Sequence, residues 1–256
     1  MSLERQESLL LAQQRRGYRR LRFTGVLEDE FLDHRVQRIR RRLLLIISTA
    51  VIFQLVYTAL DLVLLPLNAS PATLPMRMMG MCGALLAFFY CRRPHTPPRR
   101  ALLAYVAAYA LNGASVAVII HLCWSLGVAM PYDGLFLVLL FGYVLLGVSF
   151  RAVSLASWGV CGLFLWLGWV VTGGSVALGY QGLFLFCANL IGSVGAYLQE
   201  HGQRGAWLNL RLLDLARQRA EADDARKLRL LAAASHDQQP PGDCRGAAQS
   251  TAAVAV

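Results

Sequence analysis

The sequence predicts an all-α, polytopic membrane protein with six transmembrane helices, followed by a cytoplasmic coiled-coil-like helix. Three observations predict this class. Hydrophobic residues make up 56% of the 256 residues and charged residues only 16%, whereas soluble domains carry about 25% charged residues. Apolar runs recur along the chain, and the basic residues gather beside these runs rather than within them.

Each apolar run has about the length, roughly 20 residues, that a helix needs to cross a hydrocarbon core about 30 Å thick. Backbone polar groups must satisfy one another in lipid, so we expect each run to be helical. Stretches that contain proline or glycine separate most runs, whereas the fourth and fifth are divided only near Arg151. The runs are Leu43–Leu65, Leu74–Cys91, Ala101–Cys123, Gly134–Phe150, Val153–Thr172 and Tyr180–Leu198.

The basic residues orient the predicted helices. All of them except Arg77 lie in residues 1–42, in the 92–100 loop, at Arg151 or after Leu198. Six crossings place all these positions on one side, which the positive-inside rule assigns to the cytoplasm. Both termini are then cytoplasmic, and the outer loops are too short to fold as a sensor domain. The first apolar run is long enough to span, so we expect no separate signal peptide.

The basic segment 1–42 has two interpretations. Its arginines could bind anionic membrane lipid, or they could only fix the topology. Binding to nucleic acid is not expected, because the segment has no base-reading motif and is tied to the bilayer.

Four ionisable residues lie in or beside the predicted spans, toward the outer face, and are candidates for ligand binding or sensing: Asp61, Arg77, His121 and Asp133. We expect Asp61 and Arg77 to pair across the short loop between their helices. His121 could ligate a metal or respond to pH, or it could simply be packed and hydrogen-bonded. Asn112 and Asn189 lie mid-span and favour hydrogen bonds between helices. The cysteines form no CxxC pair, and we predict no metal site.

A charged helix is predicted after the last span, over residues 199–233, because strong helix formers dominate there. Leu208, Leu212, Leu215 and Ala222 could form a narrow apolar seam, which Arg219 interrupts. Such a helix could transmit a movement from the membrane to a cytoplasmic output segment. The alternative is a solvated amphipathic tail.

The sequence LLAAASHD at residues 230–237 ends this helix and, with Ala225–Arg229 before it, resembles the phosphoacceptor box of bacterial sensor histidine kinases. Members of that family read A-K-x-x-F-L-A-x-x-S-H-D/E-L-R-x-P-L. The resemblance implies that His236 is the phosphoacceptor and Asp237 its assisting acid or base. An imidazole nitrogen is a nucleophile near neutral pH, and a neighbouring carboxylate can orient the ring while the other nitrogen attacks the γ-phosphate.

The match ends after Asp237, where Gln238–Gly242 replaces the family's Leu-Arg-x-Pro-Leu and only Pro241 keeps its place. Prolines and a glycine stop the helix there. We therefore expect 234–256 to be a truncated His-box stub with a disordered tail, and the chain to be a catalytically incomplete phosphotransferase. It then needs no cofactor, because ATP and Mg²⁺ bind only an intact kinase. Phosphate would come from such a kinase in trans.

The resemblance further implies the bacterial inner membrane as location and a homodimer that interacts with a response regulator or an intact kinase, and with membrane lipid. Ala188, Gly192 and Ala196 recur every four residues and let two helix backbones approach closely. This stripe could serve packing within one bundle, but we expect it to be a contact between subunits.

The front of the chain also resembles a family feature. Leu21–Phe23, Leu27-Glu28 and Phe31, followed by the arginines and a span that contains Asp61, are similar to the lead-in of multi-span sensor regions. Such regions precede histidine kinases and also diguanylate or adenylate cyclases. The predicted domains are therefore a basic segment (1–42), a sensor domain (43–198), a signalling helix (199–233) and the stub (234–256). The alternatives are a cyclase sensor region, an inert remnant, and a small transporter or channel-like protein, although no inverted repeat is visible.

Overall fold

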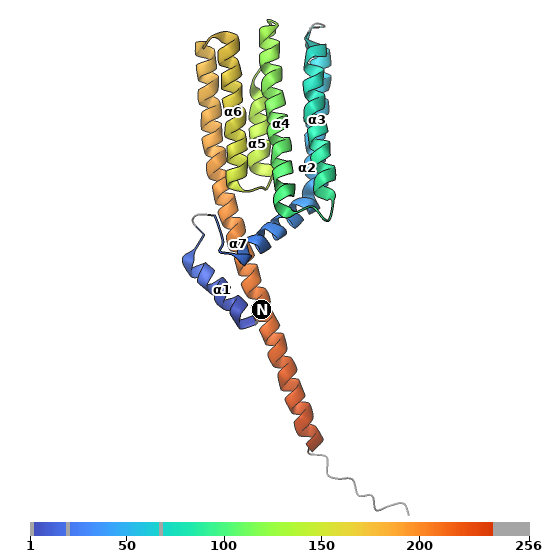
Figure 1. Ribbon diagram of the computed structural model, residues 1–256, viewed down its shortest axis with the longest axis vertical. Helices are drawn as coiled ribbons and strands as arrows, with labels where there is room; N and C mark the ends of the chain where they lie inside the picture. The colour runs from blue at the N-terminus through green and yellow to red at the C-terminus, as the bar shows by residue number, and fades with distance from the viewer. Residues whose placement is uncertain (1–2, 19–20, 67–68, 238–256) are drawn as a thin grey trace, which may run out of the picture. The chain divides into compact units, whose positions relative to one another are not determined.

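The computed structural model describes residues 3–18, 21–66 and 69–237, and all regular structure in them is helical. The predicted all-α class is therefore confirmed. Figure 1 shows the helices, which are α1 (Leu3–Arg16), α2 (Val26–Leu64), α3 (Ser70–Arg92), α4 (Pro98–Ser125), α5 (Asp133–Leu145), α6 (Phe150–Thr172) and α7 (Val176–Asp237).

The chain divides into two compact units. The larger, residues 16–207, contains α2 to α6 and the first part of α7, whose helices lie side by side as a bundle (Figure 1). The smaller combines residues 1–15 with 208–256. In its described part, Leu10 and Gln13 of α1 are buried, and Glu7 forms an ion pair with Arg219.

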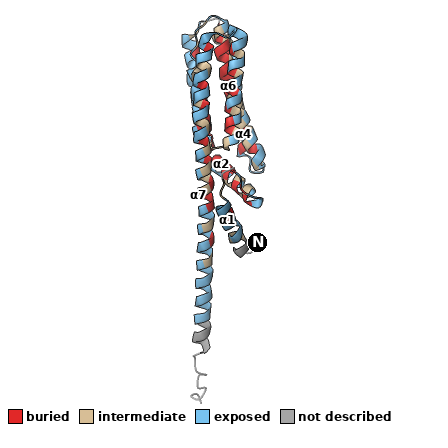
Figure 2. Cartoon of the chain, turned by 90° about the vertical axis from the view of Figure 1, so that its left-hand side faces the viewer, coloured by how far each residue is buried: buried red, intermediate tan, exposed pale blue. Residues whose placement is uncertain are grey.

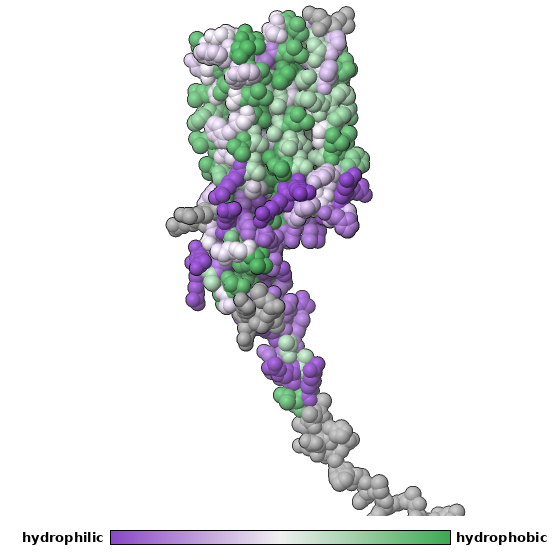
Figure 3. Space-filling view, in the orientation of Figure 1, coloured by the Kyte–Doolittle hydropathy of each residue, from purple (hydrophilic) through white to green (hydrophobic). Residues whose placement is uncertain are grey.

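Five helices are long and apolar enough to cross a membrane: α2, α3, α4, α6 and α7. The face of the bundle that Figure 3 shows is largely hydrophobic, and hydrophilic residues gather at one end of it. The chain thus has the character of a helical membrane protein. The fourth predicted span, Gly134–Phe150, is not confirmed as a crossing, because α5 has only 13 residues. At 1.5 Å per residue α5 extends about 20 Å, less than the roughly 30 Å of a hydrocarbon core.

Backbone geometry explains where two of the helices end. The residues after α5 leave the helix at Gly147, whose φ of 66° lies in the left-handed region; this conformation suits glycine and stops an α-helix. Gly173 ends α6 in the same way, with φ of 64° and its N–H donating to the carbonyl of Trp169. At the start of α2, Glu28 accepts a hydrogen bond from the backbone N–H of Phe23 at 2.7 Å, which resembles a capping interaction.

Two helices extend well beyond the apolar runs that predicted them. The helix α2 begins 17 residues before Leu43, and α7 continues from Val176 through Leu198 to Asp237. Residues 42 and 198, predicted as domain boundaries, therefore lie inside continuous helices. Charged residues in these extensions are strong helix formers, which hydropathy alone does not reveal.

Two clusters of buried side chains form the core of the bundle, which Figure 2 shows between its exposed outer faces. One cluster includes Ile39, Leu43, Tyr105, Tyr143 and Ala196. The other includes Ile120, Leu139, Phe164 and Leu185.

The seam predicted on the signalling helix is partly covered within its own chain. In the smaller unit, Leu208 and Leu215 are buried, Leu212 is half-buried and Ala222 is exposed. Arg219, which interrupts the seam, is the residue that pairs with Glu7.

Candidate functional site

A buried ion pair joins α2 to α3. The Nε and Nη2 atoms of Arg77 donate to the two carboxylate oxygens of Asp61, at 2.9 and 3.3 Å, and both side chains are buried. This pairing was predicted and is confirmed. A bidentate contact of this kind satisfies both charges, as buried charges in a membrane helix require.

The pair continues as a chain of polar side chains into α4. The Nη1 atom of Arg77 lies 3.5 Å from the side-chain oxygen of Gln54, and the Gln54 nitrogen donates to the oxygen of Asn112. A Cβ at Gly80 would collide with both amides, so the glycine makes room for them. We call Asp61, Arg77, Gln54 and Asn112 the polar chain.

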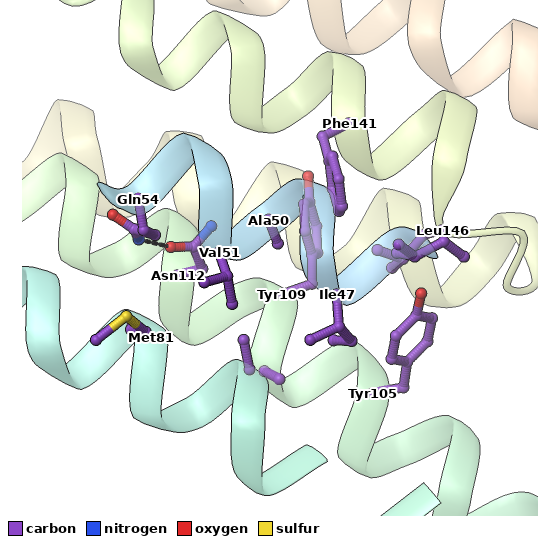
Figure 4. A pocket seen from close by; sticks show the side chains of 14 residues that line it. Ile47, Ala50, Val51, Gln54, Met81, Tyr105, Tyr109, Asn112, Phe141 and Leu146 are labelled. Atoms are coloured by element: carbon purple, nitrogen blue, oxygen red, sulfur yellow. Dashed lines mark hydrogen bonds between the residues drawn. The ribbon is translucent and has the colours of Figure 1, made fainter. Parts of the chain in front are cut away.

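The order of donors along the polar chain is fixed. Because arginine has only donors, Gln54 must present its oxygen to Arg77 and its nitrogen to Asn112, which must accept through oxygen. The Asn112 nitrogen lies on the far side of the amide (Figure 4) and has no hydrogen-bond partner among the described residues. The polar chain therefore ends in an unused donor.

A cavity of about 490 Å³ lies beside the polar chain, between α2, α3, α4 and α5. Its volume lies within the range of small-molecule sites, roughly 300–1,000 Å³. We call it the bundle cavity. Its polar lining residues are Gln54, Tyr57, Arg77, Asn112 and Asp133, and the other lining residues are apolar apart from Gly134. A second hollow of about 30 Å³, drawn in Figure 4, shares Gln54 and Asn112 with it.

His121 takes no part in lining the bundle cavity. Its Nδ1 donates to the carbonyl of Ala117 at 2.8 Å, and its ring packs against Trp124 and Phe164 with centroids 4.8 and 4.7 Å away. The buried Nε2 has no hydrogen-bond partner in the described chain. No group of three His, Cys, Asp or Glu side chains among the described residues could hold a metal ion. The geometry thus favours the packed interpretation of His121.

The other sensing candidates lie near one another. Arg77 and Asp133 both line the bundle cavity, and Asp61 adjoins it through Arg77. Asp133 is exposed at the first residue of α5.

The small-residue stripe of α7 packs inside the chain. A Cβ at Gly192 would collide with the ring of Tyr143 on α5, and Ala196 belongs to the same buried cluster as Tyr143. Ala188 packs against the other core cluster. At Gly192 the stripe therefore packs against α5 of the same chain, and its role as a contact between subunits stays a prediction.

Asn189 joins three helices, as the mid-span asparagines were expected to do. Its oxygen accepts from the Tyr143 hydroxyl at 2.8 Å, and its nitrogen lies 2.7 Å from the Cys161 sulfur on α6.

A second polar network connects the start of α2 with α6 and α7. One oxygen of Glu200 accepts from Arg35 at 2.8 Å and from Arg204 at 3.0 Å, and the other accepts from the backbone N–H of Phe150 at 2.6 Å. Arg204 also makes a bidentate pair with Glu28, at 2.8 and 3.0 Å. Glu200 thereby holds the first residue of α6 and the start of α2 against α7.

Three aromatic rings enclose this network. The Arg204 guanidinium carbon lies 4.4 Å from the ring centroid of Phe31 and 5.0 Å from that of Phe23, and Trp207 packs against both rings. Contacts of this kind add cation–π attraction to the ion pairs. We call the whole set the ion–aromatic cluster; its members are Phe23, Glu28, Phe31, Arg35, Glu200, Arg204 and Trp207.

Electrostatics in the ion–aromatic cluster shift two pKa values. Burial alone would raise the pKa of Glu28, but its hydrogen bonds from Arg204 and from the Phe23 backbone, with the charges of Arg204 and Arg35, lower it overall. Burial lowers the pKa of Arg35, against the opposing effect of Glu200.

Sequence reasoning did not single out Glu200, Arg35, Arg204 or Trp207. One signal could have found them: Glu200 is the only acidic residue between Asp133 and Asp214, and it lies two residues after the last apolar run. A lone carboxylate beside many arginines predicts an ion pair, although not its partners. Phe23, Glu28 and Phe31 were singled out only through the resemblance.

The predicted phosphoacceptor residues are described only in their backbone, which is helical as far as Asp237. The side chains of His236 and Asp237 lie outside the described residues, as does the whole of 238–256. No protein-family model and no curated protein sequence matches this chain.

Proposed function

We propose that this chain is the membrane sensor module of a two-component sensor histidine kinase in the bacterial inner membrane. In this proposal the bundle receives a stimulus within or beside the membrane, and α7 transmits it to the phosphoacceptor His236. Asp237 assists proton transfer, and the phosphate comes from an intact kinase acting in trans.

One observation carries the proposal. The helix α7 is uninterrupted from Val176, in the last apolar region, to Asp237 in the phosphoacceptor motif. A displacement of a helix at one end moves its other end, because the i to i−4 hydrogen bonds resist local extension. The continuity of α7 supports a role in transmitting a movement from the membrane to the phosphoacceptor motif.

The ion–aromatic cluster supports the same proposal. Glu200 contacts Arg35 of α2 and the start of α6 in addition to Arg204 of α7 itself. A rearrangement of α2 or α6 would therefore change the partners of Glu200 and bear directly on α7.

The proposed topology has six crossings with both termini in the cytoplasm. The short helix α5 would complete its crossing with the irregular residues 146–149, and Leu146 among them is buried by protein. Irregular backbone is tolerated at membrane depth where protein covers it. Reporter fusions at residues 70, 96, 128, 176 and 205 should read out, in, out, out and in; an inward reading at 176 would remove the α5 crossing.

Phosphotransfer tests the function itself. The 256-residue chain in membrane vesicles would be incubated with labelled ATP and an ATP-binding kinase domain added in trans. Acid-labile label on the wild-type chain, lost in His236→Gln and retained in His201→Gln, is the expected result. Equal labelling of wild type and His236→Gln would contradict the assignment of His236.

A further inference from the structure

The walls of the bundle cavity are apolar over most of their extent. Its apolar lining includes Phe53 from α2, Ile119 from α4, and Leu137, Phe141 and Val144 from α5. Apolar walls of this kind suit a hydrocarbon body, since burial of apolar surface is the main favourable term in binding such a group.

The polar end of the cavity offers hydrogen-bond donors. The order of the polar chain requires the Asn112 oxygen to face Gln54, and the Asn112 nitrogen has no hydrogen-bond partner within the described residues. The hydroxyl of Tyr57 has no hydrogen bond among the described residues, and its ring lies under Arg77, 5.3 Å from the guanidinium carbon. A bound group at this end should therefore be an acceptor.

The charges around the cavity select against an anion. Arg77 is already neutralised by the bidentate contact with Asp61. Asp133 lines the cavity, and its carboxylate would repel an anion. A cation would be attracted by Asp133 but would leave the N–H group of Asn112 without an acceptor. A neutral acceptor remains.

We propose that the bundle cavity binds a neutral amphiphile whose carbonyl oxygen accepts hydrogen bonds from Asn112 and Tyr57 while its hydrocarbon part lies against α4 and α5. Two sources supply this chemistry: an ester-linked lipid of the bilayer, or a small ketone or ester dissolved in it. Binding of such a ligand does not depend on the proposed signalling role and is measured without any signalling readout.

Equilibrium binding of labelled 2-undecanone to the full chain in detergent micelles tests the proposal. Unlabelled undecane has the same chain without the carbonyl, and it should compete roughly 30-fold more weakly, as expected for loss of two hydrogen bonds. Undecanoate should also compete more weakly than the ketone, because it carries a negative charge. Equal competition by undecane and 2-undecanone would overturn the proposal.

A neutral diester lipid, dioleoylglycerol, distinguishes the two sources. Competition by dioleoylglycerol supports the proposal with a bilayer lipid as the occupant. Failure to compete, with 2-undecanone still bound better than undecane, supports it with a small carbonyl compound.

Variants of the lining residues test where the ligand binds. Leu137→Trp fills the cavity from α5 and should weaken 2-undecanone binding at least tenfold, whereas Leu183→Trp, at an exposed leucine of α7 outside the lining, should not. Asn112→Asp keeps the acceptor that faces Gln54 but removes the donor, so the preference for 2-undecanone over undecane should fall about fivefold, to the part that Tyr57 provides. Tyr57→Phe should halve that preference or more, and it serves if Asn112→Asp does not fold. Unchanged binding in Leu137→Trp would overturn the proposed location.

Discussion

The polar chain and the ion–aromatic cluster both bury charges in the larger unit, but they connect the protein differently. In the polar chain Asp61 pairs with Arg77, 16 positions later. In the cluster Glu200 pairs with Arg35, 165 positions earlier, and also holds the backbone of Phe150. The cluster therefore ties the front of the bundle to its last helix, whereas the polar chain ties neighbouring helices.

The two networks also differ in what they leave unused. Both oxygens of Glu200 accept hydrogen bonds, so its acceptors are committed to the protein. The polar chain ends at Asn112, whose nitrogen has no hydrogen-bond partner in the described part of the chain, beside the bundle cavity. One network is thus organised to hold helices together, and the other leaves a group available for a ligand.

The largest effect is expected at Glu200. Replacing it by Leu leaves Arg35 and Arg204 buried with fewer partners and removes the acceptor of the Phe150 N–H. Breaking a buried ion pair lowers the free energy of unfolding by about 3–5 kcal/mol, and the loss here should lie near the upper end of this range. Thermal or denaturant unfolding of the bundle in detergent measures this loss. Arg217→Gln, which breaks the exposed pair with Glu221, is the control and should change stability by at most about 0.5 kcal/mol.

A smaller loss is expected at Asp61. In Asp61→Asn, Arg77 keeps its contact with Gln54 and gains a neutral acceptor, so the loss should be about 3 kcal/mol, near the lower end for a broken buried pair. The same unfolding measurement applies. A loss larger than that of Glu200→Leu would reverse the order that the comparison predicts.

Gly192→Leu should be destabilising by overpacking, because the new side chain meets the Tyr143 ring. Overpacking costs about 1–3 kcal/mol. A matched change at Gly195, where a Cβ meets nothing within 4 Å, should be tolerated. If Gly192→Leu were as stable as wild type but dimerised less, the stripe would be a contact between subunits.

The smallest effect concerns pH. The pKa of Glu28 is lowered below its ordinary value of 4.5 in the folded chain. Its contribution to stability is then present above pH about 4.5 and is lost as the pH falls through the folded pKa. Stability measured between pH 7 and pH 3 should fall less steeply in Glu28→Gln than in wild type. If the stability of both proteins fell equally with pH, the contact of Glu28 with Arg204 would make no contribution to stability.

The sequence predicted the helices far better than the contacts between them. Apolar runs located five of the long helices, and opposite charges across a short loop identified the pair of Asp61 and Arg77. Hydropathy did not reveal that Gly147 ends α5 early, because a glycine within an apolar run does not disclose its φ angle. It could not place Glu200 against Arg35 either, since the packing of the whole bundle decides which of many arginines meets a carboxylate. The stripe at Gly192 predicted close packing correctly, but small residues do not say which helix approaches them.

The ion–aromatic cluster should hold α7 against the bundle, and one distance measurement tests this most directly. Spin labels at the exposed positions Arg38 of α2 and Ala206 of α7, both in the larger unit, report the separation by pulsed electron paramagnetic resonance. We expect one narrow distance distribution in wild type and in Arg217→Gln, and a broadened or shifted one in Glu200→Gln. An unchanged distribution in Glu200→Gln would contradict this role of the cluster.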